Sequence, residues 1–283
     1  MRFVFLGTGT SAGVPAIGCD CPVCSSADPR DHRTRTSAFL HLIDPQGHER
    51  VILIDTSPDL RAQALRERLR RCDAILFTHN HVDHTFGLDE VRRFNAVQKT
   101  PISIYAEAKT MGDLRRVFAH IFDKDKNVND SFVASLIPYQ IEPEKPFDLY
   151  GLRVTPLRIL HGKLGILGYR FDVLDKASAA AESRLPLAYC TDVSGIPPET
   201  WKHLRGLKTL VLDALRHRKH QTHLCVDEAV TVAENVGAEE TYFVHMSHDL
   251  PHAQTNAELP DGIRLAHDGL VLGQLETIGP AAG

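Results

Sequence analysis

The chain has 283 residues, of which 43% are hydrophobic and 24% are charged, a composition that predicts a globular protein with ample core. Its formal net charge of -4 and its pI near 6.5 disfavour a general nucleic-acid binder, which usually carries a strongly basic face. No apolar run in the sequence approaches the ~20 residues of a membrane span. Because no linker, repeat or low-complexity tract divides the sequence, we expect a single domain over residues 1–283.

The N-terminal segment has a short apolar run at residues 3–6, followed by Gly7-Thr8-Gly9. This run is too short for the apolar region of a secretory signal, so the sequence favours a cytoplasmic protein. Structural disulfides are rare in a reducing compartment, and the six cysteines therefore need another explanation.

The first three cysteines, Cys19, Cys21 and Cys24, form a C-x-C-x-x-C loop. Thiolates at this spacing can hold three corners of a tetrahedral zinc site, which leaves the fourth corner to a distant residue. Three free thiols in a loop are the alternative, because half a zinc motif is weaker than a paired one. The other three stand singly in element-like segments and are expected to be small buried apolar side chains: Cys72, Cys190 and Cys225.

A strand pair and a helix are predicted next. Residues 37–43 and 50–55 have the pattern of strands, and the turn-forming residues 44–47 join them as a hairpin. Asp55 ends the second strand. Residues 58–69 predict an amphipathic helix whose arginines face solvent and whose apolar face comprises Leu60, Ala64, Leu65 and Leu69.

The segment 78–84 reads Thr-His-Asn-His-Val-Asp-His and follows the apolar run 74–77, which predicts a buried strand. His79 and His81 are spaced i, i+2, so both imidazoles reach one ion only from extended or turning backbone. Asp83 and His84 then face elsewhere, towards a second ion. Nitrogen and oxygen donors of this kind suit zinc, manganese or iron. The alternative is a histidine-rich surface loop, since 16 histidines make some clustering expected.

Beyond this loop the pattern predicts helices at 88–98 and 108–121, with a strand at 102–105 between them. Residues 122–135 are polar and lack clear periodicity, which fits a lid beside an active site as well as an inert surface excursion.

The second half contains strands that lead to polar residues. Predicted strands at 152–160, 187–190, 209–212 and 241–244 lead respectively to His161, Asp192, Asp213 and His245, and a further strand occupies 168–173. Acid and imidazole groups at strand ends are how a sheet edge assembles a site from remote sequence. Residues 224–236 predict a helix with Thr222 as its N-cap.

The complete H-x-H-x-D-H motif, followed in order by a later histidine, aspartate and histidine, resembles the metallo-β-lactamase superfamily of metal-dependent hydrolases. The resemblance implies an α/β (α+β) chain folded as a four-layer αββα sandwich, with one or two metals at the sheet edge. It also implies that Asp55 orients the metal loop through hydrogen bonds without binding metal. The first metal would be held by His79, His81 and His161. The second would be held by Asp83, His84 and His245, with Asp192 bridging the two.

Two ions so placed, ~3.5–4 Å apart, bind a hydroxide between them, lower the pKa of its water and neutralise charge on the attacked group. This is machinery for hydrolysis, in which Asp83 and Asp192 act as catalytic carboxylates. The sequence has no Gly-x-Ser-x-Gly elbow that would supply a side-chain nucleophile. The donor set accepts zinc, manganese, iron or nickel, and we expect the two divalent ions to be zinc or manganese.

Several local sequences are similar to the phosphoribosyl cyclic phosphodiesterases of bacterial phosphonate breakdown: Gly-Thr-Gly at 7–9, Gly-Val-Pro at 13–15, Gly-Tyr at 168–169 and His-Met-Ser-His at 245–248. This resemblance implies a structural zinc held by the three loop cysteines and His248. It also implies that His223 gives a proton to the departing alkoxide, help that is typically worth ~10²–10⁴-fold. A histidine that only begins a surface helix is the alternative.

Basic residues near these positions are candidates for phosphate contacts. Arg216 and Lys219 lie in the basic run 215–220, and Lys163 closely follows His161. A positive patch in an acidic chain could attract a phosphate-bearing small molecule, although a solvated loop is the commoner explanation for such a run. We therefore expect a small phosphodiester, cyclic or linear, as substrate and neither a membrane nor a nucleic acid as partner. Monomer and homodimer stay open.

Three other functions fit parts of the sequence. A tRNA 3′-processing nuclease of the same superfamily would need a protruding arm and a basic surface, and the sequence indicates neither. A β-lactamase or thioesterase usually lacks the cysteine loop. A non-hydrolytic protein resembling the pyrroloquinoline quinone accessory proteins shares that loop but has a degraded metal motif, whereas the motif is complete here. Loops 122–135 and 175–185 match no phosphodiesterase pattern, so the leaving group stays open.

Overall fold

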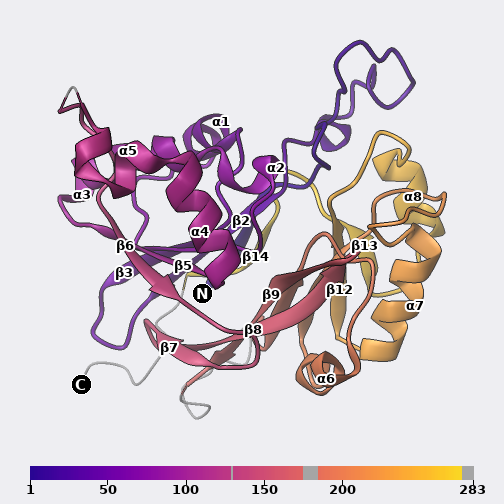
Figure 1. The fold of residues 1–283 in the computed structure, drawn as a ribbon. Helices are drawn as coiled ribbons and strands as arrows, with labels where there is room; N and C mark the ends of the chain where they lie inside the picture. The colour runs from indigo at the N-terminus through magenta and orange to yellow at the C-terminus, as the bar shows by residue number, and fades with distance from the viewer. Residues whose placement is uncertain (129, 175–183, 276–283) are drawn as a thin grey trace.

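The computed structural model describes residues 1–128, 130–174 and 184–275, which form two seven-stranded sheets with helices on their outer faces (Figure 1). The first sheet has the strand order β14-β1-β2-β3-β4-β5-β6, and the second has the order β13-β12-β11-β10-β9-β8-β7. This is the αββα arrangement that the resemblance implied. The predicted fold class is confirmed.

The first sheet is mixed. β1 (Arg2–Gly7) pairs antiparallel with β14 (Val271–Gly273) and with β2 (Ser37–Ile43), which pairs antiparallel with β3 (Glu49–Ile54). Three strands then run parallel to β3, namely β4 (Ala74–Leu76), β5 (Ile102–Ala106) and β6 (Leu136–Gln140). Parallel pairing brings the C-terminal ends of β3 and β4 to the same edge.

The second sheet repeats this division. Antiparallel pairing joins β7 (Phe147–Leu149), β8 (Leu152–His161), β9 (Leu164–Val173) and β10 (Leu187–Cys190) in succession. Parallel pairing joins β10 to β11 (Thr209–Asp213), β12 (Glu240–Val244) and β13 (Ile263–Leu265). The C-terminal ends of β8, β10, β11 and β12 therefore lie at one edge.

Helices cover the outer faces of both sheets (Figure 1). The first sheet carries α1 (Leu60–Arg66), η2 (Leu88–Val91), α3 (Arg92–Gln98), α4 (Ala108–Val117), α5 (Ala119–Phe122) and η3 (Lys124–Lys126). The second carries α6 (Pro198–Trp201), η5 (Lys202–Leu204), α7 (Val226–Val236) and α8 (His252–Glu258). The short α2 (Val82–Thr85) follows β4, and the segment between β1 and β2, which contains η1 (Pro29–Asp31), projects beyond the helices.

Apolar side chains fill three layers. Residues such as Phe3, Leu76 and Tyr169 pack between the two sheets with no exposed surface. A second cluster lies between the second sheet and helices α6 to α8, and a third lies between the first sheet and helices α1 to α5. Strands buried on both faces need apolar residues at every position, which explains the unbroken run at 74–77.

Several predicted elements differ in detail. The helix predicted at 108–121 is interrupted at Phe118, whose φ of -104° and ψ of 40° leave the helical region. The helix predicted at 88–98 begins with the 3-10 turn η2. Leu65, predicted on the buried face of α1, is 63% exposed. Leu60 and Ala64 define the buried stripe, and the next residue lies ~100° further round the helix.

The start of α7 also differs from the prediction. Its N-cap is Cys225 rather than Thr222. The side chain of Glu228 accepts a hydrogen bond from the amide of Cys225, and the two residues form a capping box. The capping box pairs backbone amides at the start of α7, so the helix begins at Val226. Residues 222–224, including His223, lie in the loop before it.

The prediction for the single cysteines is confirmed, since Cys72 and Cys190 are fully buried and Cys225 is 3% exposed. The predicted loop at 175–185 falls largely outside the described residues, which resume at residue 184. Among the described residues, no helix combines the length and apolarity that crossing a membrane requires.

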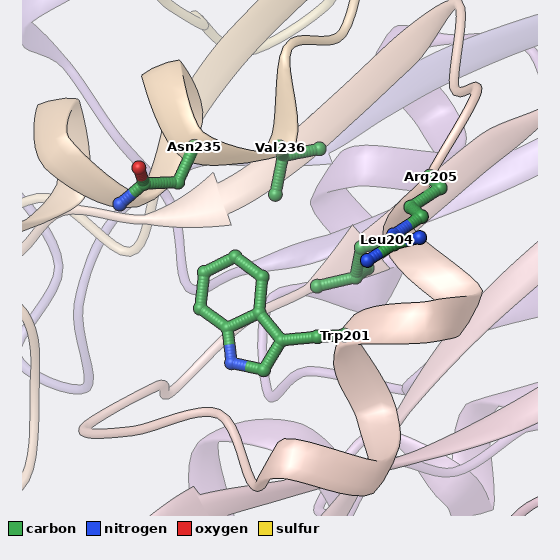
Figure 2. A pocket seen from close by; sticks show the side chains of 5 residues that line it. All are labelled: Trp201, Leu204, Arg205, Asn235 and Val236. Carbon is green, nitrogen blue, oxygen red and sulfur yellow. The ribbon is translucent and has the colours of Figure 1, made fainter.

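A pocket of about 380 Å³ lies between η5 and the C-terminal end of α7 (Figure 2). Its lining includes Trp201, the only tryptophan of the chain, together with Leu204, Arg205, Asn235 and Val236. The indole donates to the carbonyl of Ile196 at 3.2 Å. Since α7 begins near the C-terminal strand ends and runs away from them, this pocket lies at the opposite end of the sheet from the site described next.

Candidate metal centre

Polar side chains from both sheets converge where parallel strands end. Asp55 directly follows β3, and the metal loop at 78–84 follows β4. On the facing sheet, His161 ends β8, while Asp192 and His245 closely follow β10 and β12. Two hydrogen bonds join the sheets here: the amide of Leu167 donates to the carbonyl of Thr78, and the Tyr169 hydroxyl donates to the carbonyl of Phe77.

Three of these strand-end residues have left-handed backbone. The φ angles are 61° at Asp55, 58° at Asp192 and 61° at His245. Such angles are uncommon for residues other than glycine, cost on the order of 1–3 kcal/mol each, and cluster at functional sites where surrounding contacts hold them in place. These left-handed angles turn the chain sharply where each strand ends, so the side chains of the three residues lie at the edge of the sheet.

The first predicted donor set, His79, His81 and His161, is brought together. One ligand atom of each residue lies within 4.8 Å of the others. The ring centroids are 4.5 Å apart for His79 and His81, and 5.1 Å apart for His81 and His161. His81 is exposed whereas the other two are buried, so this set opens to solvent at His81.

The second predicted set, Asp83, His84 and His245, also forms, and Asp192 lies within it. Nε2 of His84 lies 3.2 Å from one Asp192 oxygen, and Nε2 of His245 lies 3.3 Å from the other. Both nitrogens are within 3.6 Å of Asp83. Asp192 also groups with His161 of the first set, so its carboxylate lies between the two sets, as a bridging ligand would.

Hydrogen bonds to neighbouring groups hold three of the imidazoles at Nδ1. Nδ1 of His84 donates to Oδ2 of Asp55 at 2.8 Å, and Nδ1 of His161 donates to the carbonyl of Thr222 at 2.8 Å. The hydroxyl of Thr78 accepts from Nδ1 of His79 at 2.9 Å and donates to Asp55 at 2.8 Å. Each contact selects the tautomer whose Nε2 carries a lone pair towards the site.

Several buried polar atoms in the site have no hydrogen-bond partner among the described residues. They include Nε2 of His79, Nε2 of His84 and both ring nitrogens of His245. Native proteins pair almost all buried polar groups, so such a concentration indicates that something else satisfies them. Lone pairs of imidazole next to two carboxylates are a donor set for divalent cations. The residues present therefore fit the metals that the fold implies.

Burial and neighbouring charges set the protonation states. Burial lowers the pKa of His79 well below its usual range, which keeps its imidazole neutral. Burial opposes charge on Asp192, but the imidazoles of His245 and His84 hold its pKa well below the usual value. Against the effect of burial, Asp192 and Asp83 raise the pKa of His84. The site thus concentrates negative charge where a cation can bind.

His223 lies beside these sets, on the loop before α7. Its ring centroid is 4.7 Å from that of His161 and 4.7 Å from that of His245, to which it is stacked at 12°. Nδ1 of His223 donates to Oδ2 of the fully buried Asp213 at 3.1 Å. The other oxygen of Asp213 is 3.6 Å from Nδ1 of His245. Asp213 was expected only as a strand-end acid, and nothing in the local sequence indicates that it supports two histidines.

The cysteine loop meets His248 at a separate cluster. The sulfurs of Cys19, Cys21 and Cys24 lie 3.2, 3.4 and 3.5 Å from Nδ1 of His248. The amide of Cys24 is the main cause that lowers the pKa of the Cys21 thiol to about 6, which favours a thiolate. All four residues predicted for a structural zinc are therefore together, and thiolate and imidazole donors fit that metal.

The basic candidates are placed differently from one another. Arg216 donates to the carbonyls of residues 218 and 219 in its own loop, and Lys219 lies 3.3 Å from Glu228 of α7. Lys163 is exposed in the turn between β8 and β9, two residues after His161. His220, which the sequence did not single out, lies beside His223, with 5.2 Å between the ring centroids.

Comparison with known proteins places this geometry in a family. Residues 50–246 match the model of the beta-lactamase superfamily domain, which covers more than half of the chain. The chain therefore belongs to the metallo-β-lactamase superfamily. Among solved structures it is similar to a diphosphatase of the PhnP family, with 43% identity, a TM-score of 0.83, and coverage of 97% of this chain and 98% of that one.

Other relatives differ in their named functions. The chain is 36% identical over 272 residues to an octanoyltransferase of Porphyromonas gingivalis, a match that covers 95% of this chain but only 51% of that protein's length. It is 30% identical over 234 residues to coenzyme PQQ synthesis protein B of Methylorubrum extorquens, with coverage of 75% and 72%. Zinc-bound PqqB of Methylobacterium extorquens, 23% identical with a TM-score of 0.71 and coverage of 96% and 99%, shares the fold. The family match, the likeness to the diphosphatase and the clustered metal-binding side chains support a metal-dependent hydrolase.

Proposed function

We propose that this chain is a metal-dependent phosphodiesterase that adds water to the phosphorus of a small phosphodiester and releases an alcohol. The observation that carries the proposal is the arrangement of two donor sets with the Asp192 carboxylate close to both, and with His223 directly beside them. Two divalent cations bound there would supply an activated water and neutralise the charge that develops on the phosphate. Zinc and manganese are the two candidates.

The chain's own residues have defined tasks in this proposal. The first cation would be held by His79, His81 and His161, and the second by Asp83, His84 and His245. Asp192 would contact both. Asp55 keeps His84 in the tautomer that exposes Nε2, and it does the same for His79 through Thr78.

The leaving group needs a proton when it is an alkoxide, and His223 is placed to provide one. Its Nδ1 is held by Asp213, so its Nε2 is free for the departing oxygen. Asp213 acts as a positioning residue, because it reaches His223 and His245 but no reacting atom. We expect His223→Gln to reduce hydrolysis of alkyl esters by ~10²-fold or more and to spare p-nitrophenyl esters, whose leaving group needs no proton.

Three basic side chains were predicted to contact the phosphate. Lys163 is exposed beside the cluster, and no ion pair engages its ammonium among the described residues. Arg216 and Lys219 have partners in their own loop and in α7, so Lys163 is the strongest of the three predicted contacts. A diphosphate is a second candidate substrate class, favoured by the 43% identity to a diphosphatase, because attack at phosphorus is common to both.

The proposal is tested by hydrolysis of bis(p-nitrophenyl) phosphate by the purified protein loaded with manganese or zinc. Asp83→Ala is the control for contaminating activity, since it removes one carboxylate of the second set. Turnover that disappears in this variant supports a metallophosphodiesterase and justifies a panel of cyclic, linear and diphosphate substrates. No turnover with both cations bound would overturn the proposal. It would direct the search to esters and thioesters, or to a binding role like that of a cofactor accessory protein.

We further propose a structural zinc in the Cys19, Cys21, Cys24 and His248 cluster, which brings the total to three metals per chain. This site would staple the segment between β1 and β2 to the end of β12. Hydrogen bonds already join these two segments: the amide of Thr10 donates to the carbonyl of Met246, and the amide of Met246 donates to the carbonyl of Thr8. Elemental analysis that finds a single metal, retained after Cys19→Ser, would contradict this assignment.

A further inference from the structure

One fully buried arginine lies against the segment that carries His248. The side chain of Arg33 has no exposed surface. Its Nη1 donates a hydrogen bond to the carbonyl of Ser247 at 2.8 Å, and its Nη2 donates one to the carbonyl of Leu250 at 2.5 Å. These two carbonyls stand on either side of His248 in the chain. The guanidinium therefore holds the segment 247–250 at both ends.

The backbone of Arg33 is bonded to the base of the cysteine loop. The amide of Arg33 donates to the carbonyl of Val14 at 2.7 Å, and the amide of Val14 donates to the carbonyl of Arg33 at 2.8 Å. These bonds close the segment 14–33, which contains all three loop cysteines. Val14 also packs against Cys24 in a small apolar cluster. Arg33 thus contacts both of the remote segments that supply the four donors.

The charge on Arg33 is costly to bury. Oδ1 of Asp31 lies 3.4 Å from Nη2, and Nε has no hydrogen-bond partner among the described residues. Burial lowers the pKa of Arg33 to about 10, which still leaves the guanidinium charged at neutral pH. Such a buried ion pair adds little to stability by itself. The planar guanidinium can, however, hold two acceptors at a fixed separation, which the ammonium of a lysine does less well.

We propose that Arg33 is a positioning residue for the structural zinc: it holds the segment 247–250 against the base of the cysteine loop, so that Nδ1 of His248 faces the three sulfurs. The proposal rests on the zinc site proposed above and names a residue that sets its affinity. All three sulfurs lie within 3.5 Å of that nitrogen. Donors that are ordered before the cation arrives bind it more tightly, because binding then loses less conformational entropy.

Titration with Co²⁺ under reducing conditions tests this role. Co²⁺ bound by thiolates absorbs in the near ultraviolet, and the catalytic donor sets consist of histidine and aspartate, so this absorption reports the cysteine cluster alone. Zinc is then measured by displacement of Co²⁺. We expect Arg33→Met to raise the Kd for both metals by about 10–100-fold and Arg33→Lys to raise it by a smaller factor. The matched control is Arg30→Met, which removes an exposed guanidinium that pairs with Asp28, and it should change neither Kd.

Thermal unfolding separates positioning from a role in folding alone. Zinc raises the Tm by an amount that depends on its Kd, and Cys24→Ser shows how much of this rise belongs to the catalytic cations. A positioning role predicts a smaller zinc-dependent rise in the Arg33 variants than in the wild type. Equal rises would overturn it, even if both variants are less stable without metal. Arg33→Lys decides the question if Arg33→Met does not fold.

The outcomes also separate this role from the zinc site itself. Wild type that shows the thiolate absorption, together with Arg33 variants of unchanged Kd, would overturn the role of Arg33 and keep the structural zinc. Wild type that never shows the absorption would overturn both.

Discussion

Replacement of Asp55 by asparagine probes how the sheet edge prepares the metal loop. Asp55 is fully buried, and its two oxygens accept hydrogen bonds from the amide and hydroxyl of Thr78 and from Nδ1 of His84, each at 2.8 Å. Its φ of 61° is a conformation that asparagine also tolerates. Asp55→Asn therefore keeps the size and the backbone and changes only one acceptor into a donor.

The size of the effect follows from these contacts. If the remaining oxygen faces the Thr78 amide, the new amide group meets the Thr78 hydroxyl and His84. The imidazole can then pair only by accepting at Nδ1, which moves its proton to Nε2 and blocks metal binding there. A buried polar mismatch costs about 1–3 kcal/mol of folding free energy, and loss of such a supporting contact weakens metal affinity by about 10–100-fold.

Two measurements check this reasoning. Competition with a chelator gives the affinity of the second cation, and thermal unfolding of the metal-free protein gives the cost in stability. Asp148→Asn is the matched control, because Asp148 is half exposed and, in the described part of the chain, forms an ion pair only with Arg153. Asp55→Asn protein that binds both cations with wild-type affinity would refute the orienting role. Asp55→Ala should be less stable still, by about 1–2 kcal/mol, since alanine resists the left-handed backbone.

Three further predictions follow from the structure. Cys24→Ser should lower the metal content by one zinc per chain in elemental analysis, while the catalytic cations stay bound. Burial, helped by nearby arginines, lowers the pKa of His252 to about 4 from its usual value near 6.5. The unfolded chain therefore takes up a proton first as pH falls, and stability present above pH 6.5 is lost between 6.5 and 4. Between pH 6.5 and pH 4 the wild type should therefore lose more folding free energy than His252→Gln does. After a discount for solvent screening, the difference should be on the order of 2 kcal/mol. Leu76→Ala, at a fully buried position, should cost about 2–5 kcal/mol, whereas Leu65→Ala should stay within about 0.5 kcal/mol; urea unfolding followed by Trp201 fluorescence compares the two.

The sequence alone determined the candidate metal donors in pattern and order. The metal loop could be predicted because its donors are adjacent in the chain, and a buried apolar strand before it implies a sheet edge. His161, Asp192 and His245 could be predicted because each ends or follows an apolar run. The cysteine loop and His248 could be matched only through a resemblance, since more than 220 residues separate them.

Errors of the sequence-based prediction lie where neighbouring residues compete. A single helix at 108–121 satisfied the periodicity, yet packing breaks it at Phe118. Thr222 is a good N-cap residue by type, but the capping box between Cys225 and Glu228 takes that place. The carbonyl of Thr222 instead holds His161. Local preference is weak compared with such tertiary contacts, so it could not decide between these arrangements.

Only the tertiary structure decided how the donors are supported and what surrounds them. Asp213 reaches His223 and His245 because parallel β11 and β12 bring their ends side by side, a relation that no sequence spacing contains. Val82 and Phe86 are about half exposed because Asp83 and His84 turn the opposite face of α2 inwards. Sequence records which groups are present and in what order. Their distances, burial and free lone pairs arise only when remote strands meet at one edge.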